Sequence, residues 1–258
     1  MIDVRSISYR YPGEAGLTVL RGVSLTLRRG EYVALMGANG SGKTTLARSL
    51  NGLIHPCEGC VSVDGMSASD ETELYEIRRR VGMVFQNPDT QIVATTVERE
   101  IAFGLENLGV DHPEMVRRID AALARFDLSE YRQASPHLLS GGERQRLALA
   151  SVWVMHPHYY VLDEPTSLLD PHARREILGF LQRERQAGDR GILLITQFAE
   201  EALGCDRLAV MDAGAIVLDG PPPDVFRRIP ALHALGLDVP VGIELEDYLK
   251  EHGIASFV

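Results

Sequence analysis

A glycine-rich segment at residues 37–44, Gly-Ala-Asn-Gly-Ser-Gly-Lys-Thr, constrains the fold more than any other part of the chain. It follows the continuous apolar run 32–36 and precedes the helix-forming stretch 45–50. A strand, a glycine loop and a helix in this order are typical of the phosphate-binding loop of nucleotide-binding α/β domains. A plain glycine turn ahead of a helix is the alternative interpretation.

The residue types of this loop suit ATP and Mg²⁺. Glycines let successive backbone N–H groups turn inward around phosphates, and the helix that follows directs its positive dipole end at them. Lys43, one of only two lysines beside 24 arginines, would reach the β- and γ-phosphates, and the Thr44 hydroxyl would bind Mg²⁺. The expected nucleotide-binding residues are Gly37, Asn39, Gly40, Ser41, Gly42, Lys43, Thr44 and Thr45.

Two adjacent acids follow a second apolar run, at residues 159–164. Asp163 stands where a Mg²⁺-side carboxylate is expected at a strand end. Glu164 is placed to polarise an attacking water as a general base. The phosphate loop alone leaves kinases, GTPases and ATPases open, and a nucleoside monophosphate kinase would also need a site for an acceptor nucleotide.

The order of apolar runs predicts an α/β fold. Buried strands alternate with helical stretches in the second half of the chain, which is typical of a parallel sheet, and period-two alternation near the amino terminus predicts antiparallel strands. Helical character runs from Glu71 to about Phe126 around one strand, and again from Pro171 to about Gln186. The predicted strands are 2–5, 23–27, 32–36, 61–65, 81–85, 159–162, 192–195, 208–211 and 215–218.

The charge balance argues against nucleic acid as a partner, because 36 acidic and 26 basic residues give a net charge of −10 over 258 residues. No apolar run reaches the length of a membrane span and no signal peptide is evident, so a cytosolic chain is expected unless a partner holds it elsewhere. Cys57 and Cys60 form a CxxC sequence in a turn. Reduced thiols there are the simpler interpretation, with a redox or metal role as the alternative.

Residues 139–146, Leu-Ser-Gly-Gly-Glu-Arg-Gln-Arg, resemble the LSGGQ signature of the ATP-binding cassette (ABC) ATPases. A serine and glycines at a helix amino terminus make an anion site, and Ser140 with Glu143 also fits a capping box. The resemblance implies that Ser140, Gly141 and Gly142 bind the ATP of a second subunit in a head-to-tail dimer. Other ABC motifs match as well and extend the resemblance over residues 1–220.

The resemblance assigns further roles. Tyr11 would stack on adenine, Gln86 would touch Mg²⁺ or the attacking water, and Asp170 would reach across the dimer. It implies an ABC core with a mixed sheet, an antiparallel β subdomain and a helical subdomain at about 87–155 that docks on transmembrane helices. Residues 221–258 would form a short, mostly helical extension.

A narrower resemblance is to the ATPases of energy-coupling-factor importers. It rests on the segments 86–91, 96–104, 163–171 and 235–240. It implies uptake of a vitamin or of nickel or cobalt ions, with the chain at the cytoplasmic face of the cell membrane. The implied partners are a second ABC ATPase subunit, identical or related, a transmembrane coupling subunit and a membrane substrate-binding subunit.

Gln197 departs from the family pattern, which has a histidine after the last core strand. An amide donates a hydrogen bond to phosphate but carries no positive charge. We therefore expect Gln197 to support slower hydrolysis than histidine, with Glu164 still the base. Glu143, where the signature usually has glutamine, is a milder variation.

Other function classes stay open at this point. They are another class of ABC transporter, a regulatory ABC ATPase, and the DNA-repair type. The last usually inserts long coiled coils between phosphate loop and signature, whereas only about 95 residues without heptads separate Lys43 from Ser140. Translation factors of this family carry two cassettes in one chain.

Overall fold

The larger of two β-sheets forms the centre of the protein in this computed structural model, which describes residues 1–13 and 17–252. Its strands lie in the order β10-β9-β3-β8-β7-β6, all parallel except β10, which pairs antiparallel with β9. The strands are β3 (Tyr32–Met36), β6 (Val81–Val84), β7 (Tyr159–Asp163), β8 (Gly191–Ile195), β9 (Arg207–Asp212) and β10 (Ala215–Gly220). The mixed sheet expected from the sequence is confirmed.

The smaller sheet is antiparallel, with the order β2-β1-β4-β5. Its strands are β1 (Ile2–Arg10), β2 (Thr18–Leu27), β4 (Glu58–Val63) and β5 (Met66–Ser67). The strand predicted at 61–65 begins earlier, at Glu58, which pairs with Ser8 beyond a bulge in β1 between Arg5 and Ser8. Opposite this bulge, Gly59 has a φ of 78°. A side chain at Gly59 would place its Cβ 2.4 Å from the Arg5 carbonyl oxygen.

Strand β3 explains why the sequence at 32–36 is apolar without interruption. Tyr32, Ala34 and Met36 face one hydrophobic core, and Val33 and Leu35 face the other. Successive side chains of a strand point to opposite faces, so a strand that is covered on both faces needs an apolar residue at every position. The helix α1 (Lys43–Leu50) packs in the second core, together with β1, β2 and β4.

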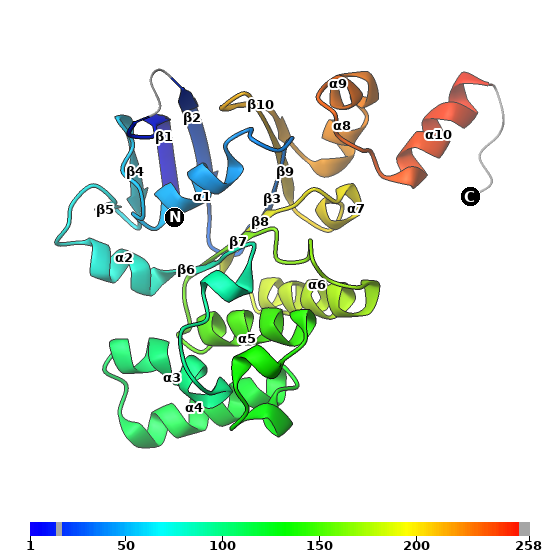
Figure 1. Ribbon diagram of the computed structural model, residues 1–258. Helices are drawn as coiled ribbons and strands as arrows, with labels where there is room; N and C mark the ends of the chain where they lie inside the picture. The colour runs from blue at the N-terminus through cyan, green and yellow to red at the C-terminus, as the bar shows by residue number, and fades with distance from the viewer. Residues whose placement is uncertain (14–16, 253–258) are drawn as a thin grey trace.

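Most of the remaining helices cover the first core, whereas Ile77 of α2 packs in the second. Figure 1 shows α3, α4 and α5 gathered at the end of the molecule opposite β1, β2 and β4. This group lies inside the range 87–155 expected for a helical subdomain, whose boundaries remain a prediction. The helices are α2 (Leu74–Arg80), α3 (Val97–Asn107), α4 (His112–Arg125), α5 (Gly141–Trp153), α6 (Pro171–Gln186) and α7 (Ala199–Ala202), with short 3₁₀ turns at η1 (Pro88–Thr90), η2 (Ser129–Tyr131) and η3 (Pro136–Leu138).

The described residues after 220 include three helices, α8 (Pro222–Phe226), α9 (Ile229–Ala234) and α10 (Val241–Glu251). That residues 221–258 form a separate extension stays a prediction. Figure 1 shows α10 projecting from the body of the molecule, while residues 253–258 lie outside the described part. Within residues 1–13 and 17–252, no helix has both the length and the apolar character needed to cross a bilayer.

The two cysteines of the CxxC sequence are exposed free thiols, with Cys60 already inside β4. In the described part of the chain, no group of three or more His, Cys, Asp and Glu residues is arranged to hold a metal ion. Whether Cys57 and Cys60 are simply reduced thiols or have a redox or metal role stays open.

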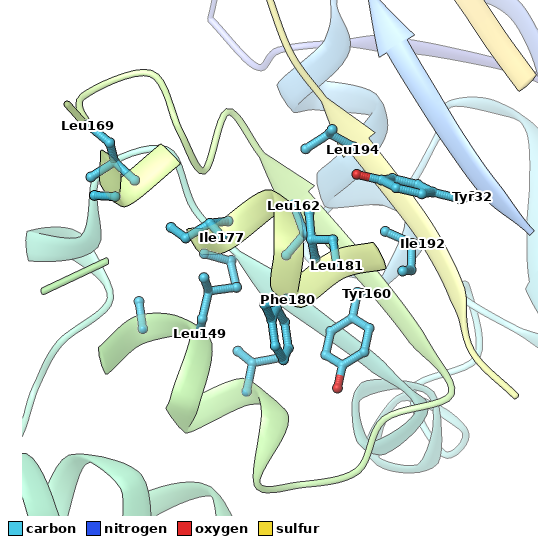
Figure 2. Close-up of a cluster of buried hydrophobic side chains, with 14 of the residues drawn as sticks. Tyr32, Leu149, Tyr160, Leu162, Leu169, Ile177, Phe180, Leu181, Ile192 and Leu194 are labelled. Carbon is cyan, nitrogen blue, oxygen red and sulfur yellow. The ribbon is translucent and has the colours of Figure 1, made fainter. Parts of the chain in front are cut away.

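The first core joins the sheet to α5 and α6. Figure 2 shows Leu181 and Phe180 of α6 among side chains of β3, β7 and β8, including Tyr160 and Ile192. Because protein interiors are close-packed, a methylene removed here leaves a void that its neighbours cannot fill completely.

We expect Leu181→Ala to lower the free energy of unfolding by about 2–5 kcal/mol, as measured by urea denaturation. Leu203→Ala removes the same atoms from a side chain that is 40% exposed, whereas Leu181 is 0% exposed. The control should therefore unfold close to the wild type. Equal urea-denaturation midpoints for Leu181→Ala and Leu203→Ala would contradict this description of the core.

Candidate functional site

Four chain segments meet at the carboxyl edge of the large sheet. The phosphate loop follows β3, Gln86 follows β6 and Gln197 follows β8. Asp163 is the last residue of β7, and Glu164 comes directly after it. These four strands are parallel neighbours, so their carboxyl ends lie at one edge. The sheet thus brings together residues that are far apart in the sequence.

The phosphate loop has backbone donors but no side-chain cap. Gly42 is the N-cap of α1 with a φ of 107°, and no side chain accepts from the first turn of the helix. The first amides of a helix lack partners within the helix, so here they remain available to an anion. Gly37 has no room for a side chain, since a Cβ would lie 2.2 Å from the Met211 carbonyl oxygen.

An unsatisfied hydroxyl indicates where a ligand fits. The Ser41 Oγ is buried and has no hydrogen-bond partner within the described residues. A buried polar atom without a partner costs stability, so its retention in this loop fits a site that a polar ligand such as a phosphate completes.

Lys43 lies buried behind the loop. Its Nζ donates to the backbone oxygens of Gly37 (2.6 Å) and Ala38 (3.0 Å). Burial lowers the pKa of Lys43, while the nearby carboxylates of Glu164 and Asp163 raise it. The ammonium is therefore held among backbone carbonyl oxygens and acids, at the position where phosphate oxygens would enter.

Asp163 and Thr44 form a pair of oxygen ligands. Burial raises the pKa of Asp163, and a hydrogen bond with the Thr44 hydroxyl opposes that rise. Mg²⁺ prefers oxygen ligands and is commonly held by one or two carboxylates together with substrate phosphates. The pair fits Mg²⁺ on the chemistry of its donors, and bound phosphates would have to supply other ligands.

The Glu164 carboxylate accepts from two amides. The Gln86 Nε2 donates to Glu164 Oε2 (3.0 Å) and the Gln197 Nε2 donates to Glu164 Oε1 (2.7 Å). Gln197 also donates to Asn39 Oδ1 (3.1 Å), which ties it to the phosphate loop. A carboxylate held in this way beside a phosphate site can accept a proton from water.

Tyr11 lies beside α1. Its hydroxyl is 3.2 Å from the Thr45 Oγ1, and its ring meets Tyr9 edge-on with centroids 5.0 Å apart. Tyr11 therefore lies next to the helix that follows the phosphate loop, and Tyr9 packs against the second core.

Ser140 and Asp170 serve other helices in this chain. Ser140 and Glu143 form the expected capping box of α5, and the Glu143 carboxylate, whose pKa is lowered chiefly by a hydrogen bond from Tyr131, accepts from the Ser140 N–H. Asp170 caps α6 by accepting from the His172 and Ala173 amides. In the described part of the chain no hydrogen bond joins Ser140, Gly141, Gly142 or Asp170 to the phosphate loop.

Sequence reasoning missed two supports of the site. The Gly214 N–H, in the β9–β10 turn, donates to the backbone carbonyl oxygen of Ser41 (3.0 Å). Glu201 is a buried acid that accepts from Thr166 and Thr196, next to the ends of β7 and β8. Neither residue belongs to a motif, and no local sequence pattern distinguishes Glu201 from its neighbour Glu200.

Known proteins resemble this chain over nearly its whole length. The family described as ABC transporter matches residues 20–167. The energy-coupling factor transporter ATP-binding protein EcfA1 of Clostridium novyi (strain NT) is 43% identical over 256 residues, which cover 98% of this chain and 91% of that protein. This chain belongs to the energy-coupling factor ATP-binding proteins of the ABC transporter family. The resemblance seen in the sequence, including its narrower form, is confirmed.

Other relatives of this ABC ATPase agree. EcfA1 of Bacillus subtilis (strain 168) is 43% identical over 99% of this chain and 90% of that protein. The structure of cbiO1 from Clostridium perfringens, described as part of the ABC transporter complex cbiONQ, superposes with a TM-score of 0.79 at 31% identity, covering 95% of this chain and 98% of that one. A dimeric ATP-binding cassette, MJ0796, bound to ADP and Pi gives a TM-score of 0.78 at 26% identity over 86% and 99%.

We expect Lys43→Arg to abolish ATP hydrolysis by this ABC ATPase although it preserves the charge. The planar guanidinium is bulkier than the compact ammonium and does not fit the space where Lys43 contacts Gly37 and Ala38. Phosphate release measures the loss. The matched control is Lys250→Arg, at the only other lysine, which is exposed on α10. Normal hydrolysis by the Lys43 variant would refute the role of the loop.

Proposed function

We propose that this chain is the ATP-hydrolysing motor of an importer of the energy-coupling-factor type, at the cytoplasmic face of the cell membrane, and that its cargo is a vitamin or a nickel or cobalt ion. The observation that carries the catalytic part is the Glu164 carboxylate, oriented by Gln86 and Gln197 beside Lys43 and Asp163. Family membership supports the transport part.

The phosphate loop and Tyr11 bind the nucleotide in this proposal. Lys43 exchanges the Gly37 and Ala38 oxygens for β- and γ-phosphate oxygens, and Ser41 and the first amides of α1 donate to the phosphates. Tyr11 offers its ring to adenine. The Gly214 contact holds Ser41 from behind.

Glu164 acts as the general base. It accepts a proton from a water that attacks the γ-phosphorus, and the bond to the bridging oxygen breaks with its electron pair leaving on ADP. Gln86 and Gln197 keep the carboxylate in place, and Gln197 is positioned to donate to the γ-phosphate. Thr44, Asp163 and Gln86 would hold Mg²⁺, which neutralises charge on the phosphate oxygens when bound.

A second ATPase subunit completes each site. Ser140, Gly141 and Gly142 lie at the start of α5, where helix amides face outward, and Asp170 starts α6. Because no hydrogen bond among the described residues joins them to the phosphate loop of their own chain, they are available to an ATP bound by the partner. ATP binding then closes the dimer and hydrolysis reopens it.

A transmembrane coupling subunit docks near Gln86. Three apolar side chains from segments on either side of Gln86 in the sequence are at least half exposed: Tyr75 of α2, Val93 after η1 and Phe103 of α3. The Tyr75 hydroxyl donates to the Asn107 oxygen at the end of α3, and the Val93 N–H donates to Glu100 of α3. These bonds join α2 and the segment after η1 to α3, which gives the docked subunit a single surface to contact.

Gln197→His should raise the rate of ATP hydrolysis several-fold in the assembled complex. A histidine can carry a positive charge next to the γ-phosphate, whereas the amide cannot. Gln197→Ala, which removes the donor altogether, should fall below the wild type, and Glu164→Gln should lose hydrolysis. If the histidine variant shows no gain in phosphate release, glutamine is a neutral substitute at this position.

We expect the tagged chain to copurify from membranes with a transmembrane protein, and Val93→Asp to weaken this association. A charge at Val93, which is 66% exposed, would be buried against the partner. Val217→Asp makes the same change at a 47% exposed site on β10, away from α2 and α3, and should copurify normally. Equal loss in both variants would contradict the docking site, and recovery of nucleic acid alone would contradict transport.

A further inference from the structure

Glu201 is a buried acid that neither the motifs nor the proposed catalytic roles use. It lies on α7 and is 6% exposed. Its Oε1 accepts from the Thr166 hydroxyl (2.7 Å) and its Oε2 accepts from the Thr196 hydroxyl (2.6 Å). One carboxylate thus bridges two segments that follow neighbouring strands.

The bridge stands where the backbone ladder ends. Strands β7 and β8 pair up to Asp163 and Ile195, and the Glu164 N–H donates to the Ile195 oxygen (3.0 Å). The first amide after β8, at Thr196, donates to the backbone oxygen of Leu35 in β3 (3.2 Å) and not to the β7 segment. Beyond this point side chains join the two segments: Gln197 donates directly to Glu164, and Glu201 bridges Thr166 and Thr196.

Both bridged threonines adjoin residues of the proposed reaction. Thr196 immediately precedes Gln197, and Thr166 comes two residues after Glu164. Glu164 has a φ of 49°, a left-handed conformation that is unfavourable for a residue with a side chain. Such a conformation persists only where the surrounding structure holds it in place.

The turn after Glu164 is held by hydrogen bonds of its own and by Glu201. The Ser167 N–H and hydroxyl both donate to the backbone carbonyl oxygen of Glu164, at 3.2 and 3.0 Å. Thr166 lies inside this turn, and its hydroxyl is fixed by Glu201. The carboxylate therefore anchors the turn that sets the direction of the Glu164 side chain.

Helix α6 supports Glu201 from the other side. The Arg174 guanidinium lies over the Phe198 ring, 3.7 Å from its centroid, and the Arg174 Nε is 3.7 Å from Glu201 Oε1. Burial raises the pKa of Glu201, while the two threonines and Arg174 lower it. The hydrogen bonds and the cation offset part of the cost of burying this acid.

We propose that Glu201 is a positioning residue for the hydrolysis of ATP, because it clamps the Thr166 and Thr196 segments and so fixes Glu164 and Gln197 relative to each other. This inference rests on the proposed function. Glu201 is 6% exposed and accepts from the two threonine hydroxyls, so it acts through the positions of Glu164 and Gln197.

The first test measures kcat, KM and ATP affinity for Glu201 variants in the complex purified from membranes. Glu201→Ala should lower kcat by about 10- to 100-fold, the loss expected for a misplacement of about 1 Å, while ATP affinity stays close to wild type. Glu201→Gln should recover most of kcat, since an amide can accept from one hydroxyl and donate to the other. Glu200→Ala, at the exposed neighbour on α7, should match the wild type.

The second test works from the other side of the clamp and does not remove the buried acid. Thr166→Val keeps the shape of the side chain and deletes the hydroxyl, so kcat should fall. Thr166→Ser keeps the hydroxyl and should retain the rate. In a double-mutant cycle, Glu201→Ala and Thr166→Val should be strongly non-additive, because they break the same link.

Wild-type kcat in both Glu201→Ala and Thr166→Val would overturn the inference. Parallel loss of kcat, ATP affinity and melting temperature without recovery in Glu201→Gln and Thr166→Ser would also overturn it, since that is the result for a residue needed only for folding. The proposed function is tested separately. If the wild type hydrolyses ATP no faster than Glu164→Gln, the proposed function is wrong, whatever the Glu201 variants do.

Discussion

The parallel pairing of β3, β8, β7 and β6 is the constraint on which the rest of the structure depends. Both faces of this sheet are buried, so its strands are apolar and cannot carry the polar chemistry themselves. The polar groups follow the strands, at the carboxyl edge, where each loop begins. The phosphate loop, Gln86, Glu164 and Gln197 therefore meet there although more than one hundred residues separate some of them.

The charges at this edge balance one another among side chains that are nearly fully buried. Lys43 lies near Asp163 and Glu164, Glu164 is held by two neutral amides, and Glu201 is offset by Arg174. Since burial penalises each charge separately, the arrangement is favourable only when the groups keep their positions. The same need for fixed positions serves catalysis, because oriented groups lower the barrier without reorganising.

Two helix starts in the chain are finished differently. Helix α1 begins at Gly42, which has no side chain to accept from the first-turn amides, whereas α5 is capped by the reciprocal bonds of Ser140 and Glu143. At a helix start without a side-chain cap, the free amides can bind an anion directly. At a capped start, the cap uses some of the amides and fixes the direction of the others. This difference fits one start that holds phosphate within the chain and one that is presented to a second subunit.

The sequence by itself determined the strand–loop–helix of the phosphate site, the acids after β7, the capping box of Ser140 and the extent of α6, because each depends on neighbours within a few residues. It also placed the hairpin β9–β10, although it could not show that the turn of this hairpin supports Ser41. Only the tertiary structure decided that Gln197 contacts Glu164 and Asn39, and that Glu201 joins Thr166 to Thr196. These contacts arise between segments that the sheet brings side by side, and the register of parallel strands joined by long crossovers leaves no local pattern in the sequence.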